Sequence, residues 1–481
     1  MLVNSLNLGY DAEEIRSKLV ARVVSVVASG DAELSVTAAV DLVNKCIDLF
    51  LQYMFPSTPI AHERTLRAGA SLFLSEHSLR APESMRPRDG QDQTSFAKNF
   101  TLITALCAFV MSVMPNSLLP IGKELAGPFY QASKAMFRLY EEHDLQHPDS
   151  TSLTIRIWYS SAIQNMTGKA GAAWHYHTEA SVLALRLRLY DEQAICRPSA
   201  VESRLLRANF WLLYQSDKAA VALENRPSIL GEHLFEDDLT LLEQGDQHEP
   251  LLDETKKLAQ GALEQRIVFG FHLKARIWTA AGKLVADIKS YSRWRKQLGS
   301  DNTRKDVDAA YRAMIEANLC FSTLTSNLEP WLQDPDSIEA VDPRVAAYQK
   351  TSFWCLRSNI MTTYHCLRLV ILQKCIDHDL LEIVGLSTQP LSWAIKKVDI
   401  VQDFLYELRT VPFLCYKVQG EAGVERIRRV GSLLLELAQN VENEVIRDRA
   451  RSQFEQLLDF LARLDSKASD DLDNRHLVSV P

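Results

Sequence analysis

Apolar residues recur with the period of an α-helix along almost the whole chain. Repeats at three and four residues place them on one face of a helix, whereas strands alternate every two residues. Two examples are the sets Val36, Ala39, Val40, Val43, Ile47, Phe50 and Val424, Ile427, Val430, Leu434, Leu437, Val441. Glycine and proline number only 18 and 17 in 481 residues, which disfavours a turn-rich all-β fold. The sequence therefore predicts an all-α protein.

A chain of this length is long for one ordinary domain, so we expect a large multi-helical assembly in two lobes. An acidic, proline-terminated stretch predicts a linker between them, and a polar, charged tail predicts disorder. The predicted parts are an N-terminal segment (1–33), an N-terminal lobe (34–235), the linker (236–257), a C-terminal lobe (258–465) and the tail (466–481).

Two further stretches bear on where the chain is exposed or buried. Residues 76–95 are polar, with two prolines and a glycine, and predict an exposed loop. The longest apolar stretch runs from Leu102 to Met114, short of the roughly 20 residues that span a bilayer. We interpret it as a buried core helix and expect no membrane contact. The first residues also lack the features of a signal peptide.

The segment 203–223 is apolar on most of its circumference, which is typical of a helix inside a protein. Asp217 and Lys218 lie in that buried context, and a buried charge needs a partner. Arg226 follows in the next turn and is the partner that the sequence suggests for Asp217. Pro227 then ends the helix.

This segment resembles the central signature of the fungal-specific regulatory domain of zinc-cluster transcription factors. In that family a basic residue precedes a spaced tryptophan and aromatic, then an acidic–basic pair, small residues and an Arg-Pro turn. The matching residues here are Arg207, Trp211, Tyr214, Asp217, Lys218, Ala219, Asn225, Arg226 and Pro227.

Flanking blocks extend the resemblance over roughly residues 40 to 445. One block matches at Gly171, Trp174, Ala180, Ala184 and Leu189, with Arg188 where the family often has glycine. The segment Tyr53–His62 fits the opening block, and Pro56 and Pro59 are expected to end the first helix there. The stretch from Val418 to Leu434 is similar to the starch- and maltose-responsive activators of filamentous fungi.

The resemblance implies a nuclear transcription regulator, not an enzyme, with a gene cluster for secondary metabolism or carbon use as its target. It also implies partners among other transcription-factor subunits or co-regulators, and it leaves open a small-molecule effector. The aromatic residues of 203–223 are interpreted as core packing. An effector pocket among the helices is the alternative.

Family members normally begin with six cysteines that hold two zinc ions and present a helix to DNA. The eight cysteines here are nowhere closer than nine residues apart, so we expect buried, reduced core residues instead. The net charge is −8, and the densest basic run, Arg426, Arg428 and Arg429, is interpreted as a solvated helix face. DNA contact by this chain alone is therefore not supported. A co-regulator that acts through a DNA-binding partner is the second hypothesis.

No motif for catalysis, a cofactor or a metal is apparent. His175 and His177 are two residues apart and diverge on a helix, and the pair His143 and His147 lacks a third ligand. Cys375 and His378 are interpreted as a core cysteine beside a surface histidine. An α-helical biosynthetic enzyme is the third hypothesis, but the acidic runs at 236–238 and 470–473 lie in a loop and a tail. We predict no catalytic, cofactor-binding or metal-binding residue.

Overall fold

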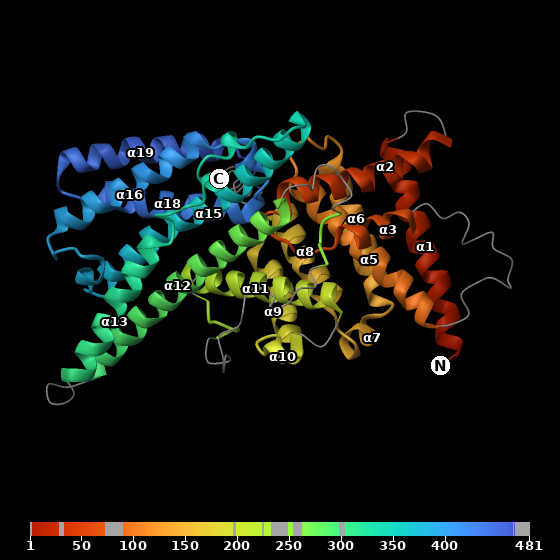
Figure 1. Ribbon diagram of the computed structural model, residues 1–481, viewed down its shortest axis with the longest axis horizontal. Coiled ribbons are helices and arrows are strands. Elements are labelled where there is room, and N and C mark those ends of the chain that lie inside the picture. The colour runs from red at the N-terminus through yellow and green to blue at the C-terminus, as the bar shows by residue number, and fades with distance from the viewer. Residues whose placement is uncertain are drawn as a thin grey trace, which may run out of the picture. The chain divides into compact units, whose positions relative to one another are not determined.

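The computed structural model describes residues 2–27, 33–72, 90–195, 199–223, 226–231, 249–253, 262–297, 304–464 and 466. Over these ranges the chain forms eighteen α-helices and no β-strand (Figure 1). The all-α fold expected from the helical periodicity is confirmed.

The chain divides into two compact units. Unit 1 comprises 1–213, 232–264 and 466–481, and unit 2 comprises 214–231 and 265–465. The chain passes from one unit to the other inside a helix, α11 (Ala200–Leu223), and again near the start of α12 (Leu263–Gln297). Most of the predicted linker at 236–257 and nearly all of the predicted tail lie outside the described residues.

Unit 1 is built around α5 (Gly90–Val113), which packs against α6 (Gly122–Arg138) and α8 (Ser150–Thr167) (Figure 1). The other helices of this unit are α1 (Leu2–Val27), α2 (Glu33–Leu49), α3 (Glu63–Leu72), α7 (Glu141–Gln146), α9 (Ala170–Arg186) and α10 (Glu192–Ile195). Of the described helices, only Gln93–Val113 in α5 is long and apolar enough to span a membrane, and 72% of its most apolar window is buried inside the protein. The predicted core helix over Leu102–Met114 is thus confirmed.

The start of α5 corrects one prediction. Residues 76–95 were expected to form a loop, but helix α5 already begins at Gly90. Residues 76–89 lie outside the described ranges. A polar first turn is compatible with a helix end that faces solvent, so composition alone placed the boundary too late.

The end of the first strong helical segment agrees with the sequence. Helix α2 continues as one π-helical turn, Phe50–Met54, and regular helix stops before Pro56. Along it Ala39, Val43, Ile47 and Phe50 are buried. Proline lacks an amide hydrogen and disfavours helix in the residue before it, which explains the stop.

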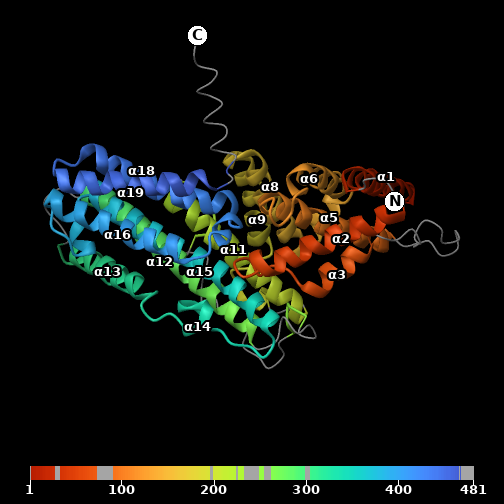
Figure 2. The same ribbon diagram turned by 90° about the horizontal axis from the view of Figure 1, so that it is seen from above.

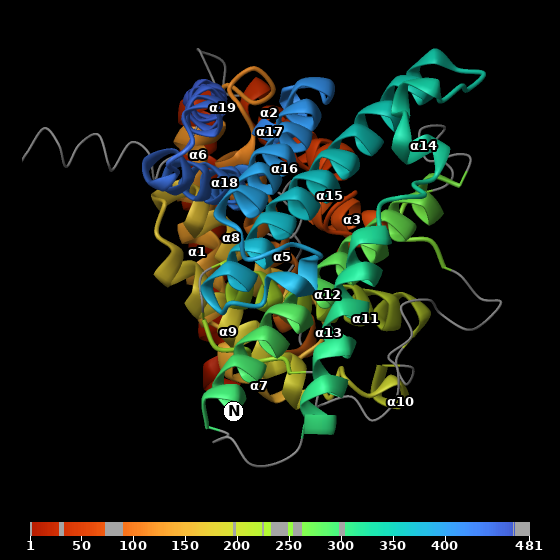
Figure 3. The same cartoon turned by 90° about the vertical axis from the view of Figure 1, so that its left-hand side faces the viewer.

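Unit 2 is centred on α15 (Pro343–Asp377), which packs against α16 (Pro390–Thr410) and α18 (Gly420–Asn440) (Figure 3). Helix α19 (Glu444–Ala462) lies alongside α18 and α16 (Figure 2). The remaining elements of this unit are α13 (Arg304–Thr323), α14 (Pro330–Gln333), the 3-10 turns Pro335–Ser337 and Leu381–Val384, and α17 (Leu414–Lys417). Asp342 accepts a hydrogen bond from the amide of Arg344, and Pro343 occupies the first turn, so the sequence itself marks where α15 begins.

Candidate functional site

The signature residues lie on α11 and on the turn that follows it. Asp217 is fully buried, and its carboxylate accepts hydrogen bonds from the Ser228 hydroxyl at 2.6 Å and the Ile229 amide at 2.7 Å. The Lys218 ammonium stands 3.9 Å from the same carboxylate. Asp217 therefore holds the turn at residues 228–229 against the end of α11.

These contacts correct the predicted ion pair between Asp217 and Arg226. The structure gives the Asp217 carboxylate Ser228, Ile229 and Lys218 as partners instead. Arg226 is half-buried, and its amide donates to the carbonyl of Ala220. Sequence proximity suggested a cation from the next turn, whereas the turn supplies a hydroxyl and a backbone amide.

Lys218 is buried and fixes the same turn from the other side. Its ammonium donates to the carbonyl of Leu230 at 3.0 Å and lies 4.5 Å from the ring centre of Tyr214. A side-chain carbon at Gly282 of α12 would come within 3.0 Å of the lysine stem, so the glycine leaves room for it. Lys218 thus links α11, the turn and α12 within unit 2.

The other signature residues have structural surroundings as well. Arg207 is buried and forms an ion pair with Glu192 of α10, while the ring of Trp211 packs edge-on against Phe210. Tyr214 is almost wholly buried, and Pro227 is exposed. Aromatic residues of α11 are packed in the protein, as the sequence predicted.

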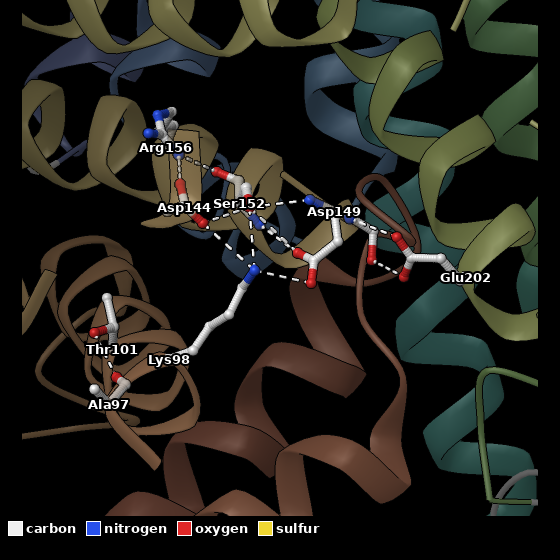
Figure 4. A network of polar contacts seen from close by, with 9 residues as sticks. Ala97, Lys98, Thr101, Asp144, Asp149, Ser152, Arg156 and Glu202 are labelled. Atoms are coloured by element: carbon white, nitrogen blue, oxygen red, sulfur yellow. Dashed lines mark hydrogen bonds and ion pairs between the residues drawn. The ribbon is translucent and has the colours of Figure 1, made fainter. Parts of the chain in front are cut away.

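A second polar cluster, in unit 1, was not anticipated from the sequence. Lys98 of α5 points between Asp144 of α7 and Asp149 at the start of α8, at 3.4 and 2.8 Å (Figure 4). Arg156 of α8 donates to the other oxygen of Asp144 at 2.8 Å. Ser152 also donates to Asp144, at 2.5 Å. We call Lys98, Asp144, Asp149, Ser152 and Arg156 the α5–α8 network.

The α5–α8 network is compensated in charge. Two acidic and two basic side chains meet, and Asp144 and Arg156 are almost fully buried. Next to it, the Glu202 carboxylate accepts hydrogen bonds from the amide and hydroxyl of Ser150 at 2.7 and 2.6 Å (Figure 4). Burial raises the pKa of Glu202. Since each charge of the network has its partner, this arrangement indicates a clamp between helices rather than a reactive centre.

Unit 2 holds a third polar cluster, which overturns one prediction. Arg426 was interpreted as part of a solvated helix face, but it is buried. Its Nη2 donates to Oε1 of Gln419 at 2.7 Å, and burial lowers the pKa of its guanidinium to about 10. The signal was present in the sequence, because Arg426 belongs to one helical stripe of buried residues on α18. The stripe consists of Gly423, Arg426, Val430, Leu433 and Leu437.

Histidines do not assemble a metal site in the described ranges. His175 contacts Glu179 at 3.1 Å, whereas His177 is buried elsewhere on α9. The ring centres of His143 and His147 lie 4.9 Å apart with the rings tilted by 51°, and His378 shares a hydrogen bond with Ser292. In the part of the chain that the structure describes, no group of three or more His, Cys, Asp or Glu side chains could hold a metal ion. The acidic runs at 236–238 and 470–473 lie outside it.

The described cysteines are free thiols. Six of them are buried as predicted, but Cys320 is exposed, contrary to the expectation, and Cys196 lies outside the described residues. A hydrogen bond to Cys415 and burial raise the pKa of Cys355, and burial together with Cys46 raises the pKa of Cys107. A thiol is reactive only as a thiolate, so these buried pairs are inert at neutral pH.

Comparison with known proteins gives no relative. No family model, no curated protein and no solved structure matches the chain.

Proposed function

We propose that this chain is the helical regulatory part of a fungal zinc-cluster-type transcription regulator. The signature residues carry the proposal. The acidic–basic pair and the Arg-Pro turn belong to one packed element, in which Asp217 and Lys218 fix residues 228–230. The all-α fold is the fold that the resemblance implies. No catalytic residue is assigned, and the protein acts in the nucleus.

A tethering experiment tests this proposal. The chain is fused to a heterologous DNA-binding domain, and a reporter gene under the matching binding site is measured in a filamentous fungus. The fusion is expected to raise or lower reporter expression at least several-fold relative to the DNA-binding domain alone. An unrelated helical protein of similar size, fused in the same way, is the control. Reporter expression equal to that control, with the fusion present in the nucleus, would contradict the proposal.

A second form of the proposal concerns DNA contact. Within these 481 residues no six-cysteine cluster occurs, and the net charge is −8. Phosphate contacts dominate the affinity of DNA-binding proteins, so an acidic chain without a basic patch is poorly suited to bind alone. We infer that DNA contact comes from a partner subunit or from a segment outside these residues. In the first case the chain is a co-regulator.

A gel-shift assay with the purified chain separates this proposal from direct recognition. We expect no sequence-specific shift with promoter fragments of the genes that the chain controls. Adding nuclear extract is expected to restore a shift that an antibody against the chain supershifts. Sequence-specific binding by the chain alone would contradict the co-regulator hypothesis. The target genes in this proposal belong to secondary metabolism or to carbon use, and the resemblance of Val418–Leu434 favours carbon use.

A further inference from the structure

Arg426 of α18 is a buried cation whose guanidinium is only partly satisfied. It is 8% exposed, and its Nη2 donates to Gln419. Gln419 in turn donates to the Ser358 hydroxyl of α15 at 2.8 Å, so the amide is held in place. The Nε of Arg426 is buried without a hydrogen-bond partner in the described structure. Leaving a buried charged donor unpaired is costly, and natural proteins seldom do so without a reason.

The nearby carboxylates on α18 do not neutralise Arg426. Glu421 and Glu425 each lie 3.6 Å from the guanidinium of Arg428, which faces another side of the helix. Cys366 of α15 interacts with Arg426, but burial raises the pKa of its thiol to about 12. The thiol is therefore neutral at physiological pH. Within the described ranges no carboxylate forms an ion pair with Arg426.

Other cationic groups adjoin the same place. Lys274 of α12 is 6% exposed, and burial together with the positive charge of Arg426 lowers the pKa of its ammonium to about 7. Arg429 lies three positions after Arg426 on α18, so the two share a side of the helix, and both interact with Cys366. The Nε of Arg429 is also buried without a hydrogen-bond partner among the described residues. Three cationic side chains from two helices, Arg426 with Arg429 and Lys274, are thus grouped together.

We propose that Arg426, Arg429 and Lys274 form a binding site for the carboxylate group of a small organic anion. A carboxylate has two acceptor oxygens and matches the edge of a guanidinium, where Arg426 still offers its Nε. It carries a single charge, whereas a phosphate dianion would lose more hydration energy on entering a buried site that has few donors. The anion would supply the paired carboxylate that Arg426 lacks among the described residues.

Binding there would connect helices within unit 2. Arg426 and Arg429 belong to α18, Lys274 to α12, and Gln419 links Arg426 to α15. An anion that binds the folded chain and not the unfolded one stabilises the fold by mass action. This inference does not rest on the regulatory proposal, because it concerns binding alone. If the chain is a regulator, the site would receive its effector.

Thermal unfolding of the full chain, with sodium acetate as the probe, tests the site. The measurement is made near pH 6, where Lys274 is charged, at constant ionic strength set with sodium chloride. We expect acetate to raise the melting temperature with a saturable dependence below about 50 mM, and calorimetric titration to give one site per chain. Chloride alone is expected to give no saturable rise.

Variants assign the effect to these residues. Arg426→Gln is expected to weaken acetate binding at least about tenfold, because it removes a charge-assisted hydrogen bond. Arg447→Gln removes the same charge from a partly exposed position on α19 and is expected to leave acetate binding unchanged. If Arg426→Gln does not fold, Lys274→Met replaces it in the test. This variant is expected to bind acetate at least about threefold more weakly.

Three results would overturn the proposal. The first is no saturable effect of acetate on the wild-type chain. The second is equal acetate binding by the wild type and by whichever of the Arg426 and Lys274 variants folds. The third is saturable stabilisation by inorganic phosphate but not by acetate, which would replace the carboxylate assignment with a phosphate site.

Discussion

Asp217 shows how one buried carboxylate can organise a turn. Replacing it with alanine leaves the buried Ile229 amide without its acceptor and takes the nearby carboxylate away from the buried Lys218 ammonium. We expect Asp217→Ala to lower the free energy of unfolding by about 3 kcal/mol. Urea unfolding followed by circular dichroism measures this loss.

Two milder variants serve as controls for Asp217→Ala. Asp217→Asn keeps an oxygen acceptor for the Ile229 amide, and Ser228→Ala removes a hydroxyl that donates to Asp217 at 2.6 Å and accepts from Lys218 at 3.4 Å, so each is expected to cost about 1 kcal/mol. If Asp217→Ala unfolds at the same urea concentration as the wild type, the assigned role of the carboxylate is wrong.

The lowered pKa of Lys274 makes the free energy of unfolding depend on pH. In the unfolded chain a lysine stays protonated up to its ordinary pKa of 10.5, whereas the folded chain lowers the pKa to about 7. Folding therefore expels a proton between these values, and this group makes the fold more stable as pH rises from about 7 toward 10.5. Below pH 7 the protonated lysine opposes folding in full.

Lys274→Met removes this dependence while it keeps a side chain of similar length. In buffer without carboxylates, the variant is expected to be more stable than the wild type near pH 6, and this advantage is expected to shrink by roughly 3 kcal/mol by about pH 9. Parallel urea titrations at the two pH values give the difference. An advantage that does not change with pH would show that the ammonium is not desolvated as described.

The sequence showed which residues are charged inside helices, but not which groups meet them. It indicated that Asp217 and Lys218 are buried, as they are. The sequence suggested Arg226 as the partner of Asp217. The actual partners include the backbone amide of Ile229, and a backbone amide cannot be recognised from residue types. The sequence placed Arg426 in solvent because arginine is usually exposed, although the helical stripe that contains it is otherwise apolar.

Among the helices of unit 1, the α5–α8 network lets us predict how much unfolding free energy two substitutions remove. Asp144→Ala leaves Arg156 and Lys98 without the carboxylate that they share, so we expect a loss of about 3–5 kcal/mol. Asp149→Ala at the cap of α8 removes an exposed partner and one capping bond, with an expected loss of about 1 kcal/mol. Chemical unfolding of both variants gives the comparison. Equal losses would contradict the clamp.

The contact between α12 and α15 depends on a glycine. A side-chain carbon at Gly270 would lie 2.3 Å from a methyl carbon of Leu356, so the Leu356 side chain or one of the two helices must shift to admit it. Gly270→Ala is expected to destabilise unit 2 by about 1–3 kcal/mol. Gly171→Ala, where no atom lies within 4 Å, is expected to be neutral or to stabilise α9 by up to about 1 kcal/mol. Differential scanning calorimetry measures both, and a neutral Gly270→Ala would show that this glycine is not needed for the packing against Leu356.

Helices were the most predictable level of this structure. The period of apolar residues identified α2, α11 and α18, and proline marked the end of the first of these. The start of α5 was missed because its first turn is polar. The α5–α8 network was missed because Lys98, Asp144 and Arg156 are far apart in the sequence, and their meeting depends on how three helices pack.

At the scale of the whole molecule, the chain forms two units whose boundary crosses helices. Unit 2 takes up the end of α11, so the signature belongs partly to each unit. Composition favours boundaries in polar linkers, and a boundary inside a continuous helix has no compositional signal. The helical class could be derived from the sequence, whereas this division required the contacts between helices.

The proposed role of the protein is the regulation of transcription. Chromatin immunoprecipitation of an epitope-tagged chain, expressed at its natural level in its own host, tests it most directly, because a direct activator and a co-regulator would both occupy promoters. We expect reproducible enrichment at a limited set of promoters, and changed transcription of the adjoining genes when the chain is deleted. A tagged chain that is present and stable, but shows no promoter enrichment above an untagged strain, would contradict a role in transcription.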